Sequence, residues 1–308
     1  MSGQTRRFSW VKFLIVAVPA WLLLSGAVAV WLHFRAEKNQ LAKVEHAYQK
    51  SVNAESLADD FTKIVDVIGP RHQGTDAATD GLKRMASMIE GALGASNMGY
   101  EVHKFPGVDG AVDAPPLLAV DVMRRKTAGE IWVLCAYDSP PDMARGADSA
   151  SAVAVTLAVA QAMVGRELTC NVHFLFLPMG YAEARSRLAM LAKAHRLITK
   201  EANATQVLVI GSMLHPGDTQ VLSRDAAQPV MTRADDLIVV AENAEICMQD
   251  DAEVSTLLHE MGLPAALLLT MGEEDAMKGS DLLNPGIGQL QQRAVSILQV
   301  IERLAENK

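Results

Sequence analysis

Short apolar runs that alternate with helical stretches constrain the fold of this chain most. Several of the runs are continuous rather than alternating in polarity, which is typical of strands covered on both faces. We predict strands at residues 100–105, 117–123, 130–136, 172–177, 206–212, 237–241 and 265–270. Helical stretches are expected at residues 77–93, 149–164, 182–200, 253–261 and 286–305. This order predicts an α/β fold, a three-layer sandwich with a central mixed, largely parallel sheet.

An uncharged segment near the N-terminus predicts a transmembrane helix before this domain. Residues 13–32 contain no charged side chain, and about 20 such residues span the hydrocarbon core of a bilayer as a helix. Arg6, Arg7 and Lys12 precede the segment, which favours a cytoplasmic N-terminus. The competing interpretation is a cleaved signal peptide, because residues 27–29 read Ala-Val-Ala.

These features divide the chain into four parts. We expect a cytoplasmic N-terminus at residues 1–12 and a single-pass transmembrane anchor helix at 13–34. A juxtamembrane helical stalk at 35–54 follows, and its helical pattern continues to residue 68. Residues 55–308 form one exocytoplasmic domain, which is periplasmic if the protein is bacterial. Residues 214–236 are the most loop-like part of this domain.

Charge and cysteine content limit the possible partners. The formal net charge of the 308 residues is −8, which argues against a nucleic-acid partner. Cys135, Cys170 and Cys247 are widely spaced, so they match neither a disulfide framework nor a metal-ligand pattern. We expect Cys135 and Cys170 to be buried thiols.

The order of short motifs along the domain is more specific than any one of them. They read GPRHQGT at 69–75, GYEV at 99–102, AYDS at 136–139, GADSASAV at 146–153, HFLFLPM at 173–179, GLPAALLL at 262–269 and SDLLN at 280–284. Over roughly residues 55–305 this order resembles the zinc-dependent aminopeptidases of metallopeptidase family 28. The resemblance implies an aminopeptidase-like fold, and in that family two zinc ions and a glutamate base hydrolyse peptides.

The residues that match the family's zinc ligands depart from its pattern. The first histidine falls on Ala136, which has no donor atom, whereas the aspartate that orients it is kept as Asp138. The bridging aspartate is kept as Asp148. The two glutamates, one a ligand and one the general base, fall on Gly180 and Tyr181.

Two further ligand positions have also changed. The second aspartate corresponds to Ser212, and the final histidine falls near Met277 or Lys278. By this comparison one of five ligands remains, and a lone carboxylate does not hold a divalent ion against water. The resemblance therefore implies no catalytic residues, no bound metal and no cofactor, with Asp138 and Asp148 as remnants of the family site.

Other potential donors are explained without a metal. His173 lies inside an apolar strand, so we expect a core or edge histidine. His259 and Glu260 begin like a zinc-protease helix, but the second histidine that this motif needs is Leu263. His215 follows the predicted strand at 206–212 and is the best substitute ligand, although a role in a turn is the competing interpretation.

The sequence favours a membrane-anchored pseudo-peptidase that binds or scaffolds protein partners, which we expect to be membrane subunits. The alternative is an active metallo-aminopeptidase or other hydrolase with a relocated zinc site built from Asp138, Asp148 and His215. A structural subunit with an unused cleft is a third possibility. Metal content discriminates the first two hypotheses, because zinc lowers the pKa of bound water and supplies the Lewis acid.

Overall fold

The computed structural model describes residues 21, 25, 26, 51–107, 114–123, 129–141, 143–200, 204–215, 219–222, 250–270 and 286–306. The chain divides into two units, Met1–Gln49 and Lys50–Lys308, and the second contains the fold. Most of the predicted segments at 1–12, 13–34 and 35–54 lie outside the described residues. Among the residues that are described, no helix is long and apolar enough to cross a membrane.

A seven-stranded mixed sheet with the order β1-β2-β4-β3-β5-β7-β6 forms the centre of the domain. The strands are β1 Glu101–Phe105, β2 Leu117–Met123, β3 Glu130–Ala136, β4 Asn171–Leu177, β5 Ala204–Ile210, β6 Thr219–Leu222 and β7 Ala265–Thr270. The four inner strands β4, β3, β5 and β7 are parallel. Antiparallel pairs β1–β2, β2–β4 and β6–β7 complete the two sides. The mixed sheet predicted from the sequence is confirmed.

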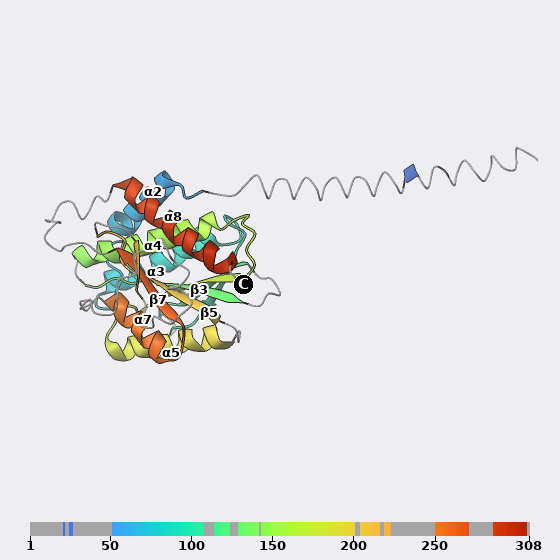
Figure 1. The fold of residues 1–308 in the computed structure, drawn as a ribbon. Coiled ribbons are helices and arrows are strands. Elements are labelled where there is room, and N and C mark those ends of the chain that lie inside the picture. Colours follow the sequence, from blue (N-terminus) through green and yellow to red (C-terminus); the bar gives the residue numbers. More distant parts are fainter. Residues whose placement is uncertain are drawn as a thin grey trace, which may run out of the picture. The chain divides into compact units, whose positions relative to one another are not determined.

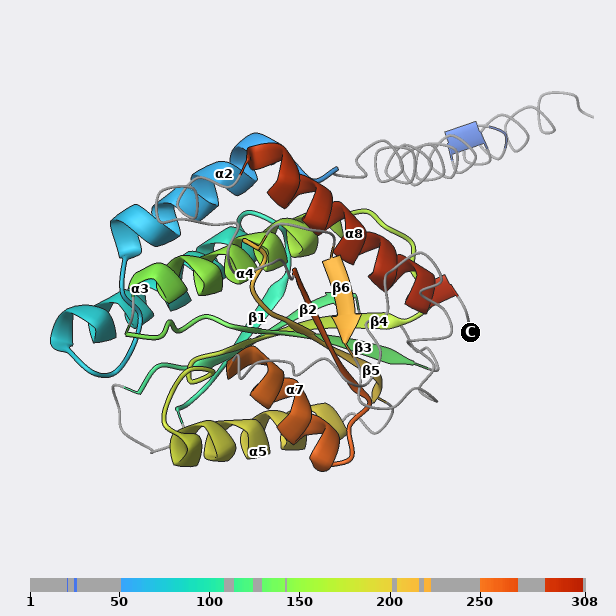
Figure 2. The ribbon, with the colours of Figure 1, turned by 60° about the vertical axis from the view of Figure 1, so that its left-hand side comes forward.

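Helices cover both faces of the sheet, as Figures 1 and 2 show. The helices are α2 Ala54–Thr62, η1 Lys63–Ile68, α3 Asp76–Leu93, α4 Met143–Ala162, α5 Ala184–Lys200, α7 Asp250–Glu260 and α8 Ile287–Glu306. Helices α2, α3, α4 and α8 lie on one face, and α5 and α7 lie on the other (Figure 2). This arrangement is a three-layer sandwich.

The alternation of side chains along the central strands divides the core in two. Along β3, Ile131 and Val133 enter the larger core beneath α4, whereas Trp132 and Leu134 enter the smaller core beside α5 and α7. Successive side chains of a strand point to opposite faces, so the continuous apolar runs of the sequence fill both cores. Helix α4 contacts α2, α3, α8 and β3, which explains why its sequence is almost uniformly small and apolar.

Two predictions about local structure need correction. Strand β6 lies within residues 214–236, which were predicted to be loop, and it was missed because its four residues pair only at the sheet edge. Residues 51–53 are not helical, so the stalk helix predicted over 35–54 does not continue into α2. Instead the Asn53 side chain caps α2 by accepting the N–H groups of Glu55 and Ser56. The strand predicted at 237–241 lies outside the described residues.

Candidate functional site

The candidate site lies at the carboxyl ends of three neighbouring parallel strands, β3, β4 and β5. Ala136, the last residue of β3, pairs with Leu177 of β4, and Cys135 pairs with Ile210 of β5. The segments that follow these strands carry the positions predicted from the family motifs. In open α/β sheets, ligands bind outside the carboxyl ends of the strands, so the fold places these positions where a site is expected.

Both carboxylate oxygens of Asp138 are engaged by the backbone. Oδ1 accepts the N–H of Gly180 at 2.8 Å, and Oδ2 accepts the N–H of Tyr181 at 2.9 Å. Asp138 is buried, and burial raises the pKa of its carboxyl to about 7, although the two N–H groups and the charge of Arg71 act in the opposite direction. Through these two hydrogen bonds, Asp138 links the segment after β4 to the segment that follows β3.

Ala136 and Gly180, which the resemblance matched to the family's first histidine and one of its glutamates, lie very close to each other. A Cβ atom on Gly180 would lie 2.4 Å from the Cβ of Ala136 and 3.3 Å from Oδ1 of Asp138. Carbon atoms pack at about 3.5–4.0 Å. Position 180 therefore accommodates no side chain at all while position 136 carries even a methyl group.

The carboxylate of Asp148, which the resemblance matched to the family's bridging aspartate, is hydrogen-bonded to Ser212. Asp148 lies in α4, and its Oδ1 accepts the hydroxyl of Ser212 at 2.9 Å. Ser151 donates to the backbone carbonyl of Asp148 and accepts the N–H of Met213. The structure thus brings Asp148 and Ser212 together in a network of hydrogen bonds that joins α4 to the end of β5.

Arg71 organises the same edge of the sheet, and the sequence analysis did not single it out. Its buried guanidinium donates to the carbonyls of Gly69, Tyr137 and Gly146 and to the hydroxyl of Ser149. Burial lowers the pKa of Arg71 to about 10, and the negative charge of Asp138 opposes this shift. The GPR turn at 69–71 was the available signal, but a motif does not reveal that its arginine is buried.

The described donors at this edge do not fit a di-zinc site. Such a site needs about four donors around each metal, whereas the oxygens of Asp138 are engaged by N–H groups and Asp148 accepts a hydroxyl. His215 lies beyond β5, and its Nε2 is buried with no hydrogen-bond partner among the described residues. The positions Met277 and Lys278 lie outside the described residues.

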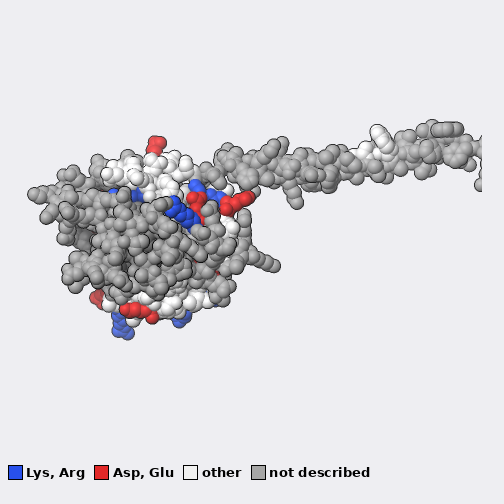
Figure 3. Space-filling view, in the orientation of Figure 1, with Lys and Arg blue, Asp and Glu red and all other residues white. Residues whose placement is uncertain are grey.

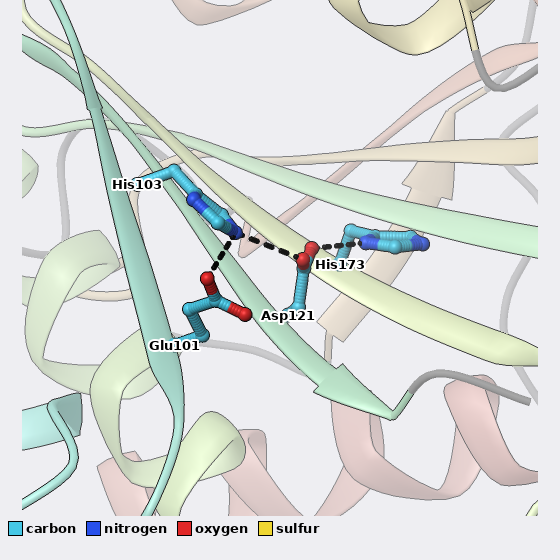
Figure 4. A network of polar contacts seen from close by, with 4 residues as sticks. All are labelled: Glu101, His103, Asp121 and His173. Carbon is cyan, nitrogen blue, oxygen red and sulfur yellow. Dashed lines mark hydrogen bonds and ion pairs between the residues drawn. The ribbon is translucent and has the colours of Figure 1, made fainter.

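A different cluster contains convergent metal-ligating side chains. Glu101, His103 and Asp121 bring one ligand atom each within 4.8 Å of one another, and they are the only such group of three in the described part of the chain. His173 contacts the same aspartate (Figure 4). Sequence analysis missed the cluster, because the residues are separated along the chain and only strand pairing joins them. The structure confirms the prediction that His173 is a buried strand residue.

Solved structures with the same fold are zinc aminopeptidases and related enzymes. The LapA aminopeptidase of Legionella pneumophila matches with a TM-score of 0.62 and 13% identity, over 85% of this chain and 75% of that chain. BSAP, a zinc aminopeptidase from Bacillus subtilis, matches with a TM-score of 0.61 and 11% identity, over 83% and 96% of the two chains. Porphyromonas gingivalis glutaminyl cyclase matches with a TM-score of 0.56 and 12% identity, over 83% and 100%.

These similarities define the class of fold as zinc-aminopeptidase-like. No family model matches the sequence, and a comparison with curated proteins finds no match. The fold expected from the motif order is thus supported by structure. Because one fold hosts many functions, what the chain does must be argued from its own residues.

Proposed function

We propose that this chain is a membrane-anchored pseudo-peptidase, an aminopeptidase-like domain without a di-zinc site that serves as a binding or scaffolding subunit of a membrane-associated complex. The observation that carries the proposal is the close approach of Gly180 to Ala136. Side chains at both positions would compete for the same volume, because their Cβ atoms would lie 2.4 Å apart. Loss of the ligands is therefore matched by a backbone that has closed over their space.

The hydrogen bonding of the two remnant carboxylates supports the same conclusion. A zinc ligand must direct an oxygen lone pair at the metal. Asp148, matched to the bridging aspartate, instead directs an oxygen at the hydroxyl of Ser212, and Asp138, matched to the aspartate that orients the first histidine, accepts two backbone N–H groups. These contacts give both carboxylates a structural role. The described part of this strand edge also lacks a placed general base near them, since position 180 is glycine and position 181 is tyrosine.

The partner surface that we propose lies at the ends of β3, β4 and β5. The lost ligands leave these strand ends less charged than a metal site, and depletion of charge is typical of the core of a protein interface.

On the face drawn in Figure 3, the described residues show acidic and basic side chains close to one another. With the net charge of −8, this favours protein partners over nucleic acid. The uncharged segment at residues 13–34 is the proposed anchor.

A metal and activity assay tests the loss of the family site. The full chain and its Asp148→Ala variant are purified in detergent, incubated with zinc, freed of excess metal and analysed by plasma mass spectrometry. Hydrolysis of aminoacyl-coumarin substrates is measured on the same samples. We expect equal zinc content in both proteins and hydrolysis no faster than in buffer. Zinc that depends on Asp148, accompanied by zinc-dependent hydrolysis, would support the relocated-site hydrolase and overturn the proposal.

A second experiment tests the binding role. The tagged full chain and its Tyr181→Arg variant are expressed in the native membrane, extracted with a mild detergent and sized. Tyr181 is half-buried at the proposed surface, and Lys83→Glu on α3 is an exposed control. We expect wild type and the control to migrate in a complex that the Tyr181 variant does not form. Equal migration of all three proteins at the size of the chain alone argues against a scaffold.

A further inference from the structure

Strand pairing places four polar side chains in a row on one face of the sheet. Glu101 of β1 pairs with Asp121 of β2, and Asp121 pairs with His173 of β4. His103 lies two residues after Glu101 and therefore points to the same side. Figure 4 shows His103 between Glu101 and Asp121, in contact with both, and His173 directed at Asp121 from the opposite side.

One nitrogen of His103 faces two carboxylate oxygens. Nε2 lies 3.2 Å from Oδ2 of Asp121 and 3.6 Å from Oε1 of Glu101. A hydrogen on Nε2 would bond only Asp121, because 3.6 Å is beyond hydrogen-bond distance, whereas a cation between the three atoms would contact both carboxylates and the nitrogen. Zinc binds nitrogen and oxygen at about 2.0–2.2 Å, which places neighbouring donors of a tetrahedron about 3.3–3.6 Å apart. The two separations from Nε2 are close to this value, and all three ligand atoms lie within 4.8 Å of one another.

A buried histidine holds the central carboxylate in place. Nδ1 of His173 lies 2.7 Å from Oδ1 of Asp121, and the His173 ring stacks on Trp132 with centroids 4.4 Å apart. The histidine thereby occupies Oδ1 and leaves Oδ2 directed toward His103. Hydrogen-bonded partners of this kind orient metal-ligating carboxylates and tune their affinity.

The cluster is accessible to solvent. It is separate from the candidate site at the carboxyl ends of β3, β4 and β5. The side chains of Glu101 and His103 are 67% and 33% exposed, whereas that of Asp121 is 9% exposed. A metal ion can therefore enter from solvent and keep water in its fourth position. His173 pairs with Trp132, four residues before Ala136 on β3, a separation of about 13 Å along the strand.

We propose that Glu101, His103 and Asp121 bind one zinc ion, with His173 as the positioning residue of Asp121. One nitrogen and two carboxylate oxygens form a ligand set that suits zinc better than calcium or magnesium, which take oxygen ligands almost entirely. The ion would link edge strand β1 to β2. This site is independent of the pseudo-peptidase proposal, because none of its residues belongs to the family's ligand positions.

Zinc titration of the full chain tests the site. The protein is purified in detergent, stripped with a chelator and titrated with Zn²⁺ in competition with a chromophoric chelator. We expect one equivalent for wild type and no stoichiometric binding for His103→Gln or Glu101→Gln. His173→Gln should keep the stoichiometry but weaken affinity about 10–100-fold. Lys104→Gln, on the same strand but paired with Glu90, should bind zinc as wild type does.

The outcomes separate this inference from the proposed function. Circular dichroism first verifies that each variant is folded. Absence of zinc binding to wild type, or equal binding by wild type, His103→Gln and Glu101→Gln, overturns the site and leaves the three side chains as an ion-pair network. The Asp148→Ala variant should still bind one equivalent. Zinc that is lost in Asp148→Ala but kept in His103→Gln contradicts both proposals at once, by placing the metal at the strand ends.

Discussion

Replacing Gly180 by alanine tests whether the backbone has closed the space of the family's ligands. The added Cβ would lie 2.4 Å from the Cβ of Ala136, more than 1 Å inside the normal carbon contact distance of about 3.5–4.0 Å. Ala136 is held by the pairing of β3 with β4, and the Gly180 N–H is held by Oδ1 of Asp138, so relief requires movement of the backbone. Overpacking of this kind costs about 1–3 kcal/mol.

The second substitution, Ala136→Gly, provides the matched measurement. Alone, it should cost about 0.5–1 kcal/mol, because glycine weakens a strand. Combined with Gly180→Ala it removes the closest contact, and the next ones lie at 3.3 Å to Asp138 Oδ1 and 3.6 Å to the Cα of residue 136. The double variant should therefore be more stable than the sum of the single changes predicts, by about 1–2 kcal/mol of coupling energy.

Thermal unfolding of the full chain in detergent, followed by circular dichroism, measures this cycle. In a domain of this size 1 kcal/mol corresponds to about 2–4 °C in Tm. Gly91→Ala is the control, since a Cβ there meets nothing within 4 Å and alanine favours the α3 helix. If Gly180→Ala leaves Tm unchanged, or if the two substitutions are additive, the two positions do not share one space and the reasoning fails.

Four further predictions concern the carboxyl ends of the central strands and the proposed anchor. The folded-state pKa of Asp138 is raised from 3.8 to about 7. As the pH rises, the carboxyl therefore loses its proton in the unfolded state at a lower pH than in the folded state. The stability of wild type relative to Asp138→Asn should therefore fall by up to about 4 kcal/mol from pH 4 to pH 7 in urea denaturation, and a constant difference would contradict this. Arg71→Met removes the donors to five buried or half-buried acceptors, so it should cost about 3 kcal/mol or more. A cost below about 1 kcal/mol in the same assay would show that the guanidinium is dispensable. Ser212→Ala removes the hydroxyl bonded to Asp148 and should cost about 1–2 kcal/mol by urea denaturation, whereas Ser212→Thr, which keeps the hydroxyl, should cost less than Ser212→Ala. Deleting residues 13–34 should release the protein from membranes during carbonate extraction, and retention in the membrane pellet would argue against this segment as the anchor.

Sequence patterns predicted the sheet and its helices well, because burial leaves a direct mark on residue choice. The continuous apolar runs at Glu130–Ala136 and Asn171–Leu177 belong to strands covered on both faces, and few other structures suit them. Strand β6 was missed, since it is short and pairs at one edge, where packing imposes little pattern. The N-cap at Asn53 was missed as well, because capping residues also occur in many loops.

The sequence by itself determined which chemical groups are missing from the family's pattern. Ala136 and Gly180 carry no donor in any conformation, so their inability to bind metal follows from residue identity alone. Only the tertiary structure decided that these two residues approach each other, that Arg71 is buried among carbonyls and that Glu101, His103 and Asp121 converge. The physical reason is that strand pairing and helix packing bring together side chains distant in sequence, and a local pattern contains no information about such distances.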